Sequence, residues 1–157
     1  MSTPVPAGRP GFIPHLVCDP CPEAIEFYKK AFGATEMFRL HAADGEKIMH
    51  CELVIGDAHF FIADDFPEYC DGKLQSPKAL GGSPVTIHRY VEDVDAAMKV
   101  AEDAGATVRM PATDMFWGDR YGVVVDPFGH NWSLATPQRQ VSPEEIKAAV
   151  QQMAEGK

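Results

Sequence analysis

The chain lacks the long apolar run that a membrane-spanning helix requires. Such a helix needs about 20 consecutive, predominantly apolar residues, and no stretch of the 157-residue sequence approaches that length. Basic residues are also few, with 14 Lys and Arg against 23 Asp and Glu and a formal net charge of −9. Because nucleic-acid binding depends on clustered Lys and Arg, we expect neither a membrane nor a nucleic-acid partner.

Short catalytic signatures are absent as well. The sequence has no G-x-S-x-G motif, no phosphate-binding loop and no dinucleotide fingerprint. Residues 1–10 hold one Arg and no apolar stretch, unlike a secretory signal, so we expect a cytoplasmic protein. Of the four cysteines, Cys18 and Cys21 form a single C-x2-C pair. A zinc site needs a second pair of ligands, so we expect reduced thiols without a role.

What the sequence does contain is one pattern written twice. Each copy has a short strand with a central histidine, an Asp-containing turn, an amphipathic helix, and a Gly-Ala-Thr exit into another strand. The first copy spans residues 12–35 and carries His15, and the second spans residues 85–107 and carries His88. Two such half-sheets can pack side by side and close a shared cavity. Matching positions then face each other, so the repeat predicts where a site would lie.

Turn signals and apolar periodicity place the remaining elements. Gly33 and Gly105 are expected to end the two helices, since glycine is favoured just after a helix. Residues 142–145, Ser-Pro-Glu-Glu, have capping-box spacing and predict a last helix with a narrow apolar stripe. The expected strands are 12–17, 35–41, 47–55, 59–63, 85–91, 107–110, 121–125 and 131–135.

These elements indicate an α+β protein built from two strand–helix–three-strand modules. The predicted divisions are an N-terminal arm at 1–10, a first βαβββ module at 11–63, a linker or flap at 64–83, a second βαβββ module at 84–137 and a C-terminal helix at 138–157.

The element order resembles the vicinal oxygen chelate superfamily, which includes glyoxalase I, extradiol dioxygenases and bleomycin-resistance proteins. Within it the chain is most similar to the PhnB-like proteins. Three segments carry the resemblance: AIEFYKKAFGA at 24–34, YVEDVD at 90–95, and WGDRYG at 117–122 with the Asp-Pro-Phe-Gly turn at 126–129. It implies paired βαβββ modules that form a curved mixed sheet around a cup-shaped cavity, commonly in a homodimer. It is specific for fold and weak for activity, because this fold hosts many chemistries.

The resemblance also implies where a metal would bind. Metal-dependent members place one ligand on the first strand and one on the fourth strand of each module. Only one of the four corresponding residues, Glu52, binds a divalent cation well; the four are Ile13, Glu52, Thr86 and Ser133. A site of nitrogen and oxygen ligands normally needs at least three protein ligands. The glyoxalase and extradiol dioxygenase pattern is therefore broken, and we predict no metal and no other cofactor.

Histidines near these positions leave other interpretations open. His15 and His88 each follow an aligned position by two residues, and His50 precedes Glu52 by two. Strand residues i and i+2 share a face, so all three are expected to point into the cup. They can be hydrogen-bonded pocket histidines, ligands of a shifted divalent-metal site, or acid–base groups that work without metal. The candidate catalytic residues are His15, Glu52 and His88. His59 is expected to be an ordinary strand or loop residue.

Aromatic and polar residues gather before the last two strands: Phe116, Trp117, Arg120 and Tyr121. On one interpretation they form an aromatic plug or a dimer contact. On the other they form a stacking wall for a flat or cationic ligand. Arg120 is a candidate anchor for a carboxylate or phosphate, unless the nearby Asp119 and Asp126 neutralise it.

We therefore expect a protein that binds a small organic molecule in the cup without the usual metal site. One alternative is a lyase, isomerase or oxygenase that acts on a small carbonyl or enediol-type substrate, and another is a structural or partner-binding module. The candidate ligand-binding residues are Ile13, His50, Thr86, Trp117, Arg120, Tyr121 and Ser133.

Overall fold

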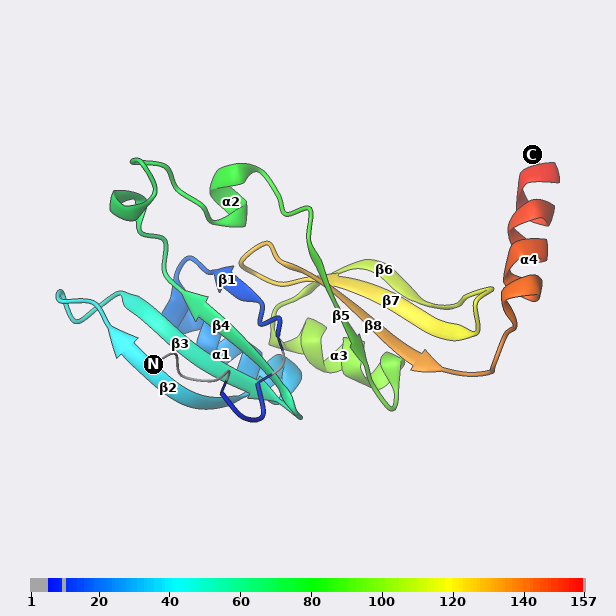
Figure 1. Cartoon of the computed structure of the whole chain (residues 1–157), viewed down its shortest axis with the longest axis horizontal. Helices are drawn as coiled ribbons and strands as arrows, with labels where there is room; N and C mark the ends of the chain where they lie inside the picture. Colours follow the sequence, from blue (N-terminus) through cyan, green and yellow to red (C-terminus); the bar gives the residue numbers. More distant parts are fainter. Residues whose placement is uncertain (1–5, 10, 157) are drawn as a thin grey trace. The chain divides into compact units, whose positions relative to one another are not determined.

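The computed structural model describes residues 6–9 and 11–156. These residues form two four-stranded mixed sheets, each with its own helix, followed by a C-terminal helix (Figure 1). The chain divides into two compact units: residues 1–83 with 127–129, and residues 84–126 with 130–157. The predicted α+β class, the paired βαβββ modules and the C-terminal helix are confirmed. Of the predicted N-terminal arm, residues 1–5 and 10 lie outside the described residues.

The first unit contains one βαβββ module followed by two short helices. Its sheet has the order β1-β4-β3-β2, in which β1 runs parallel to β4 and the other pairs are antiparallel. The elements are β1 (His15–Val17), α1 (Cys21–Phe32), β2 (Thr35–His41), β3 (Ile48–Ile55), β4 (Ala58–Ala63), the 3-10 helix η1 (Pro67–Tyr69) and α2 (Pro77–Leu80).

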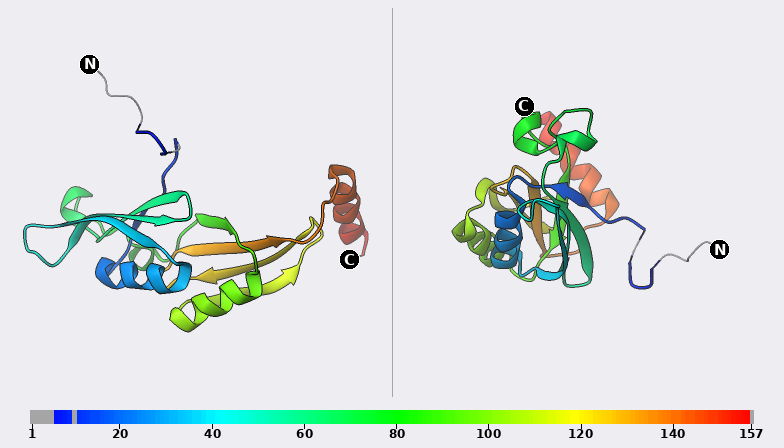
Figure 2. Two further views of the ribbon diagram at one scale, coloured as in Figure 1. Left: turned by 90° about the horizontal axis from the view of Figure 1, so that it is seen from below. Right: turned by 90° about the vertical axis from the view of Figure 1, so that its left-hand side faces the viewer.

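Helix α1 covers one face of this sheet (Figure 2). Pro22 lies in its first turn, where its missing N–H costs nothing. Gly33 ends it in the left-handed region at φ 68°. The Gly33 N–H donates to the Lys29 carbonyl and the Ala34 N–H to the Tyr28 carbonyl. Side chains alternate along β3, so Cys51 and Leu53 are fully buried on the helix side. His50 and Glu52 therefore point to the opposite face, which we call the open face of the first unit.

Two buried carboxylates anchor the segment that follows β4. Asp64 accepts hydrogen bonds from the backbone N–H groups of Cys21, at 2.8 Å, and Ile48, at 2.7 Å. Asp65 accepts from the backbone N–H groups of Gln75 and Ser76. The predicted flap at 64–83 is thus tied to the first unit at its start and at the residues that lead into α2.

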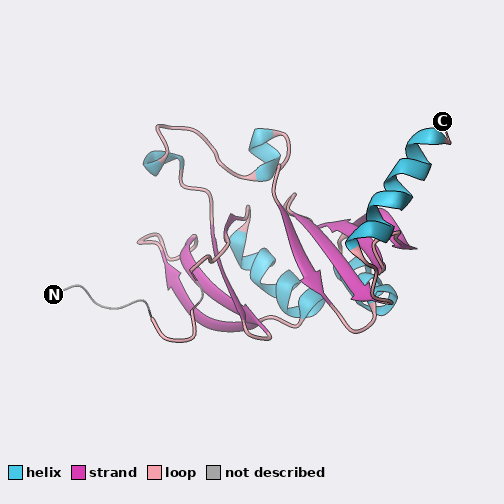
Figure 3. Cartoon of the chain, turned by 45° about the vertical axis from the view of Figure 1, so that its right-hand side comes forward, coloured by secondary structure: helices cyan, strands magenta, loops and turns pink. Residues whose placement is uncertain are grey.

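The second unit repeats the module and adds the last helix (Figure 3). Its sheet has the order β5-β8-β7-β6, with β5 parallel to β8. The Asp93 side chain accepts from Ala96 N–H at the start of α3, as expected for an N-cap. The elements are β5 (Thr86–Tyr90), α3 (Val94–Ala104), β6 (Thr107–Asp114), β7 (Asp119–Val125), β8 (Asn131–Pro137) and α4 (Pro143–Glu155).

Helix α4 starts as the sequence predicts. Ser142 accepts from the Glu145 N–H and Glu145 accepts from the Ser142 N–H, which completes the capping box. Both Val150 and Met153 of its apolar stripe are about half exposed within the chain. No helix of the described residues is long and apolar enough to cross a membrane.

Strand limits differ from the predictions by two or more residues in four strands, one of which is β8, which ends at Pro137 rather than at residue 135. Strand β1 begins at His15 rather than at residue 12, and β7 begins at Asp119 rather than at Tyr121. Strand β6 continues to Asp114, four residues beyond the predicted end. Pro111, in the added part, cannot donate to a ladder, but β6 is an edge strand with irregular register on both sides of Met110. Edge strands tolerate proline at such irregularities.

Candidate functional site

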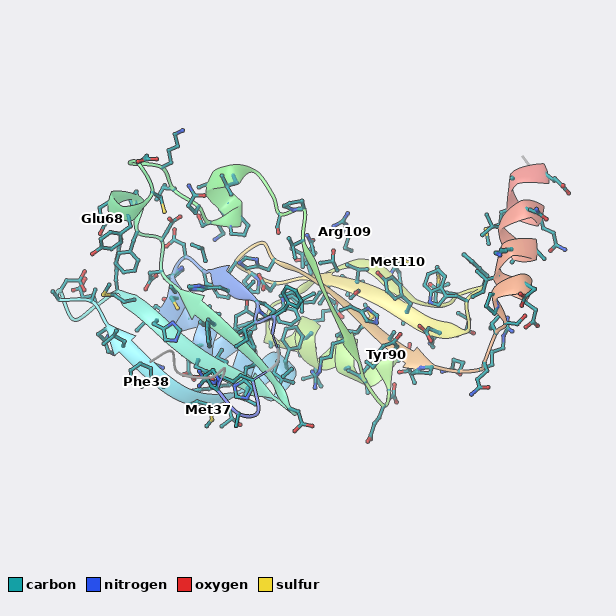
Figure 4. The ribbon with its side chains drawn as sticks, in the orientation of Figure 1. Met37, Phe38, Glu68, Tyr90, Arg109 and Met110 are labelled. Carbon is teal, nitrogen blue, oxygen red and sulfur yellow. The ribbon has the colours of Figure 1, made fainter. Side chains whose placement is uncertain are left out.

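A row of side chains crosses the open face of the first unit. His15 on β1 pairs in register with Phe61 on β4, Phe61 pairs with Glu52 on β3, and Glu52 pairs with Phe38 on β2. Residues directly opposite each other in adjacent strands point to the same face. The row therefore places one carboxylate between two aromatic rings, with an imidazole at the end (Phe38 is labelled in Figure 4).

Glu52 is the buried charge of this face. It is 6% exposed, and both of its oxygens accept hydrogen bonds. The His59 Nδ1 donates to Oε1 at 2.8 Å, and the Arg9 Nη2 donates to Oε2 at 2.8 Å. A buried carboxylate is stable when it is paired and hydrogen-bonded, and these two partners meet that requirement.

His15 and His50 lie together beside Phe61. The ring centroids of the two histidines are 6.2 Å apart, and His50 contacts the Phe61 ring edge-to-face at 4.7 Å. Partial burial lowers the pKa of His15 below its usual value, and the nearby His50 lowers it further. The His15 imidazole is therefore mostly neutral at neutral pH and able to accept a proton or a hydrogen bond.

The corresponding face of the second unit centres on a His–Ser pair. His88 on β5 is in register with Ser133 on β8, and His88 Nδ1 and Ser133 Oγ share a hydrogen bond of 2.8 Å. Ser133 is buried and His88 is exposed. The hydrogen bond fixes the ring orientation and leaves Nε2 as the nitrogen that a ligand can reach.

Aromatic side chains surround His88. The Tyr121 ring is stacked with the imidazole at 6.1 Å, and Tyr90 contacts it edge-to-face at 4.7 Å. Trp117, in the turn between β6 and β7, contacts Tyr121 at 5.6 Å and donates from its indole N–H to Asp119. Of the predicted aromatic cluster, Tyr121 lies next to His88, while Trp117 contacts Tyr121 and is itself in contact with Phe116 at 5.0 Å. Tyr90 is labelled in Figure 4.

Arg120 lies on the other face of β7, since it alternates with Tyr121 along the strand. Its guanidinium donates two hydrogen bonds to Asp95 on α3, at 2.6 and 3.0 Å, and one to Asp114 at 3.1 Å. These carboxylates raise the pKa of Arg120 above its usual value. Arg120 is thus neutralised within the second unit, although by other carboxylates than the Asp119 and Asp126 considered from the sequence.

Ile13 and Thr86 carry no charged or imidazole group to these faces. Ile13 is half-buried in the segment before β1, and Thr86 is the exposed first residue of β5, in register with Asn131. The predicted site residues therefore fall into two sets. The first unit holds Ile13, His15, His50 and Glu52, and the second holds Thr86, His88, Trp117, Arg120, Tyr121 and Ser133.

Sequence reasoning missed the polar residues His59 and Arg9 and the bond between Ser133 and His88. It also missed the rings of these faces: Phe38, Phe61 and Tyr90. His59 was expected to be an ordinary residue, yet it lies two positions before Phe61 on the same face, and this spacing was a usable signal. Arg9 is the single basic residue of residues 1–10, but no local pattern links it to Glu52. The Ser133–His88 bond depends on strand register across 45 residues.

These residues do not fit the metal site implied by the fold. Three of the four corresponding positions are Ile13, Thr86 and Ser133, which are not usual metal ligands. The fourth, Glu52, has an arginine and a histidine on its two oxygens. Across residues 6–9 and 11–156, no group of three or more His, Cys, Asp and Glu side chains is arranged to hold a metal ion.

Comparison with known proteins agrees with this architecture. Residues 13–134 match the model of the Glyoxalase/Bleomycin resistance protein/Dioxygenase superfamily. The chain belongs to this superfamily. It is 50% identical over 148 residues to an uncharacterized protein of Mycobacterium bovis, covering 94% of this chain and 97% of that protein.

Solved structures of other proteins share the fold. A gene product of Arabidopsis thaliana aligns with a TM-score of 0.63 at 30% identity, covering 81% of this chain and 98% of that chain. The fosfomycin resistance protein FosX of Listeria monocytogenes, solved with Mn(II) and sulfate, aligns with a TM-score of 0.61. Its identity is 13%, with coverage of 88% and 95%, so this likeness concerns the fold alone.

Proposed function

We propose that the protein binds a small organic molecule through the open faces of its sheets, without the metal site of the superfamily. The main observation behind this proposal is that both oxygens of Glu52 already accept hydrogen bonds from side chains of the protein. The one strong oxygen ligand at a metal position, Glu52, forms an ion pair with Arg9 and a hydrogen bond with His59. The Glu52 carboxylate and the Ser133 hydroxyl are paired with other side chains, while the Phe38 and Tyr90 rings next to them are exposed.

The chemistry of each face suits an organic ligand. The first face offers the Phe38 and Phe61 rings with the neutral His15 imidazole. The second offers the Tyr90 ring and the Nε2 atom of His88. Aromatic faces bind flat or cationic groups, and a few fixed polar atoms orient them.

The test is a thermal-shift screen of chelator-treated protein against a library of small aromatic, carbonyl and amine compounds, followed by calorimetry on the hits. We expect hits whose binding weakens in Phe61→Ala or His88→Gln and is unchanged in the control His41→Gln, an exposed histidine at the end of β2. Hits that require an added divalent cation would contradict the proposal. A screen without any hit would favour a structural or partner-binding module.

A second candidate function rests on the two histidines. His15 has a lowered pKa and is mostly neutral at neutral pH, and His88 is held by Ser133. A neutral, oriented imidazole is a suitable general base, so acid–base turnover of a small carbonyl or enediol-type substrate by a lyase or isomerase is the enzymatic alternative. Turnover lost in His15→Gln or His88→Gln, with ligand affinity retained, would support it. Turnover equal to wild type in both variants would eliminate it.

The homodimer implied by the resemblance stays part of this proposal. Light scattering on the purified protein measures it directly. A mass of twice the 17.2 kDa chain is expected, and a monomer at all concentrations would contradict it.

A further inference from the structure

The N-terminal segment supplies a cation to the open face of the first unit. Arg9 lies 43 residues from Glu52 in the sequence, and its Nη2 donates to the Glu52 Oε2. The carboxylate is 6% exposed, so it requires a positive or donating partner on that side. Because the Glu52 carboxylate needs a cationic partner and lies on a face that we propose to bind ligands, a cationic group of a ligand fits at this position.

The two partners of Glu52 differ in how firmly they are held. His59 is part of β4, in register with Val54, and its position is fixed by the sheet. Arg9 precedes β1, its side chain is 37% exposed, and among the described residues its guanidinium bonds to Glu52 through one nitrogen. A ligand can therefore replace Arg9 while His59 stays in place.

The surroundings of Glu52 suit an organic cation. In the register of the sheet, Glu52 lies between Phe38 and Phe61, and Phe38 is 53% exposed. Aromatic faces attract ammonium and guanidinium groups, and the attraction grows when the cation is partly removed from water. The formal net charge of −9 also raises the local concentration of cations near the protein.

We propose that Glu52 is the anchor of an organic-cation subsite, which a primary amine or guanidinium ligand with an aromatic or apolar body enters by displacing Arg9. This inference rests on the proposed function and narrows the ligand class. Arg9 acts as an internal competitor of the ligand. The apparent affinity for the ligand equals the intrinsic affinity multiplied by the fraction of molecules in which Arg9 has left the carboxylate.

The test uses two probes of similar size on the full chain. Phenethylamine is a cation at neutral pH and 2-phenylethanol is its uncharged counterpart. Calorimetry compares their affinities for wild type, Arg9→Ala, Glu52→Gln and Arg9→Lys, the last of which keeps the competing charge. Urea unfolding shows whether each variant keeps its folded state.

Arg9→Ala is expected to bind phenethylamine at least about tenfold tighter than wild type, since one charged hydrogen bond no longer has to be replaced. Arg9→Lys is expected to stay near wild type, and 2-phenylethanol is expected to bind wild type and Arg9→Ala equally. Glu52→Gln removes the preference for the cation. The Arg9 variants test the inference even if Glu52→Gln does not fold.

Equal affinity of Arg9→Ala for both probes, or no gain over wild type, would overturn the inference. If 2-phenylethanol still binds and loses affinity in Phe61→Ala, the proposed function stands and only the cation subsite fails. If neither probe nor any compound of the library binds, both fail together.

Discussion

Replacing Asp64 by alanine should cost the first unit several kcal/mol of stability. The carboxylate is 7% exposed and accepts from two backbone N–H groups, that of Cys21 at the start of α1 and that of Ile48 at the start of β3. The backbone N–H of Asp64, the residue after β4, also donates to the Ile48 carbonyl. Asp64, which directly follows β4, thus joins α1 and β3 to the end of that strand.

The magnitude follows from the two bonds. A hydrogen bond to a charged group contributes about 1.5–3 kcal/mol, and an unsatisfied buried N–H costs a similar amount. The two figures describe the same lost bond and are counted once for each bond, so Asp64→Ala should lose about 3–6 kcal/mol in total. Asp64→Asn keeps one acceptor oxygen but turns an amide N–H towards the second donor, so about half of that loss is expected.

Urea unfolding followed by circular dichroism and Tyr/Trp fluorescence measures the change. The matched control is Asp57→Ala, an exposed aspartate in the turn between β3 and β4, which should stay within about 0.5 kcal/mol of wild type. If Asp64→Ala is too unstable to fold, Asp64→Asn carries the test. A loss below about 1 kcal/mol in Asp64→Ala would refute the assignment of Asp64 as the clamp of this unit.

Three further outcomes follow from the packing and charges. Gly122→Ala should destabilise the second unit by about 1–3 kcal/mol, because its Cβ would clash with Met98 of α3. Met98→Ala should then cost less stability in the Gly122→Ala background than in wild type, and a neutral Gly122→Ala variant would contradict this. The pKa of His15 is lowered in the folded protein. As the pH falls through the ordinary histidine pKa, the unfolded chain therefore takes up a proton at this residue before the folded protein does. Stability should fall on acidification, less so in His15→Gln, and an NMR titration of His15 with a midpoint above the free-histidine value would reverse this sign. In native protein a thiol reagent should label Cys70 alone among the four cysteines. Cys18, Cys21 and Cys51 are fully buried, and burial raises the pKa of Cys51 to about 11. Mass spectrometry that finds label on one of these three in folded protein would contradict this.

Most of the fold could be predicted from the sequence pattern that occurs twice, at residues 12–35 and 85–107. The Gly33 and Gly105 helix ends and the capping box at Ser142 and Glu145 are local signals, so each could be read from a few neighbouring residues. The extension of β6 past Pro111 could not, because an edge strand accepts a proline where its register is already irregular.

The candidate sites were less accessible to prediction. Alternation along β3 correctly places His50 and Glu52 on one face, because the period of a strand is a local property. The Arg9–Glu52 and His88–Ser133 bonds join residues 43 and 45 positions apart. Such pairs are set by strand register and by the path of the N-terminal segment, which no motif in this sequence encodes. The same is true of Asp64, the first residue of the predicted linker or flap, whose burial no local pattern indicated.

The most direct test of the central claim is the metal content of protein purified without chelators, measured by elemental analysis in wild type and in Glu52→Gln, together with ligand binding by the same samples. The proposed function predicts substoichiometric metal in both proteins and unchanged binding of the screened ligands after chelation. One tightly held divalent ion per wild-type chain, lost in Glu52→Gln, would contradict it. Glu52 would then be a metal ligand, and Arg9 would have to leave the carboxylate to admit the ion.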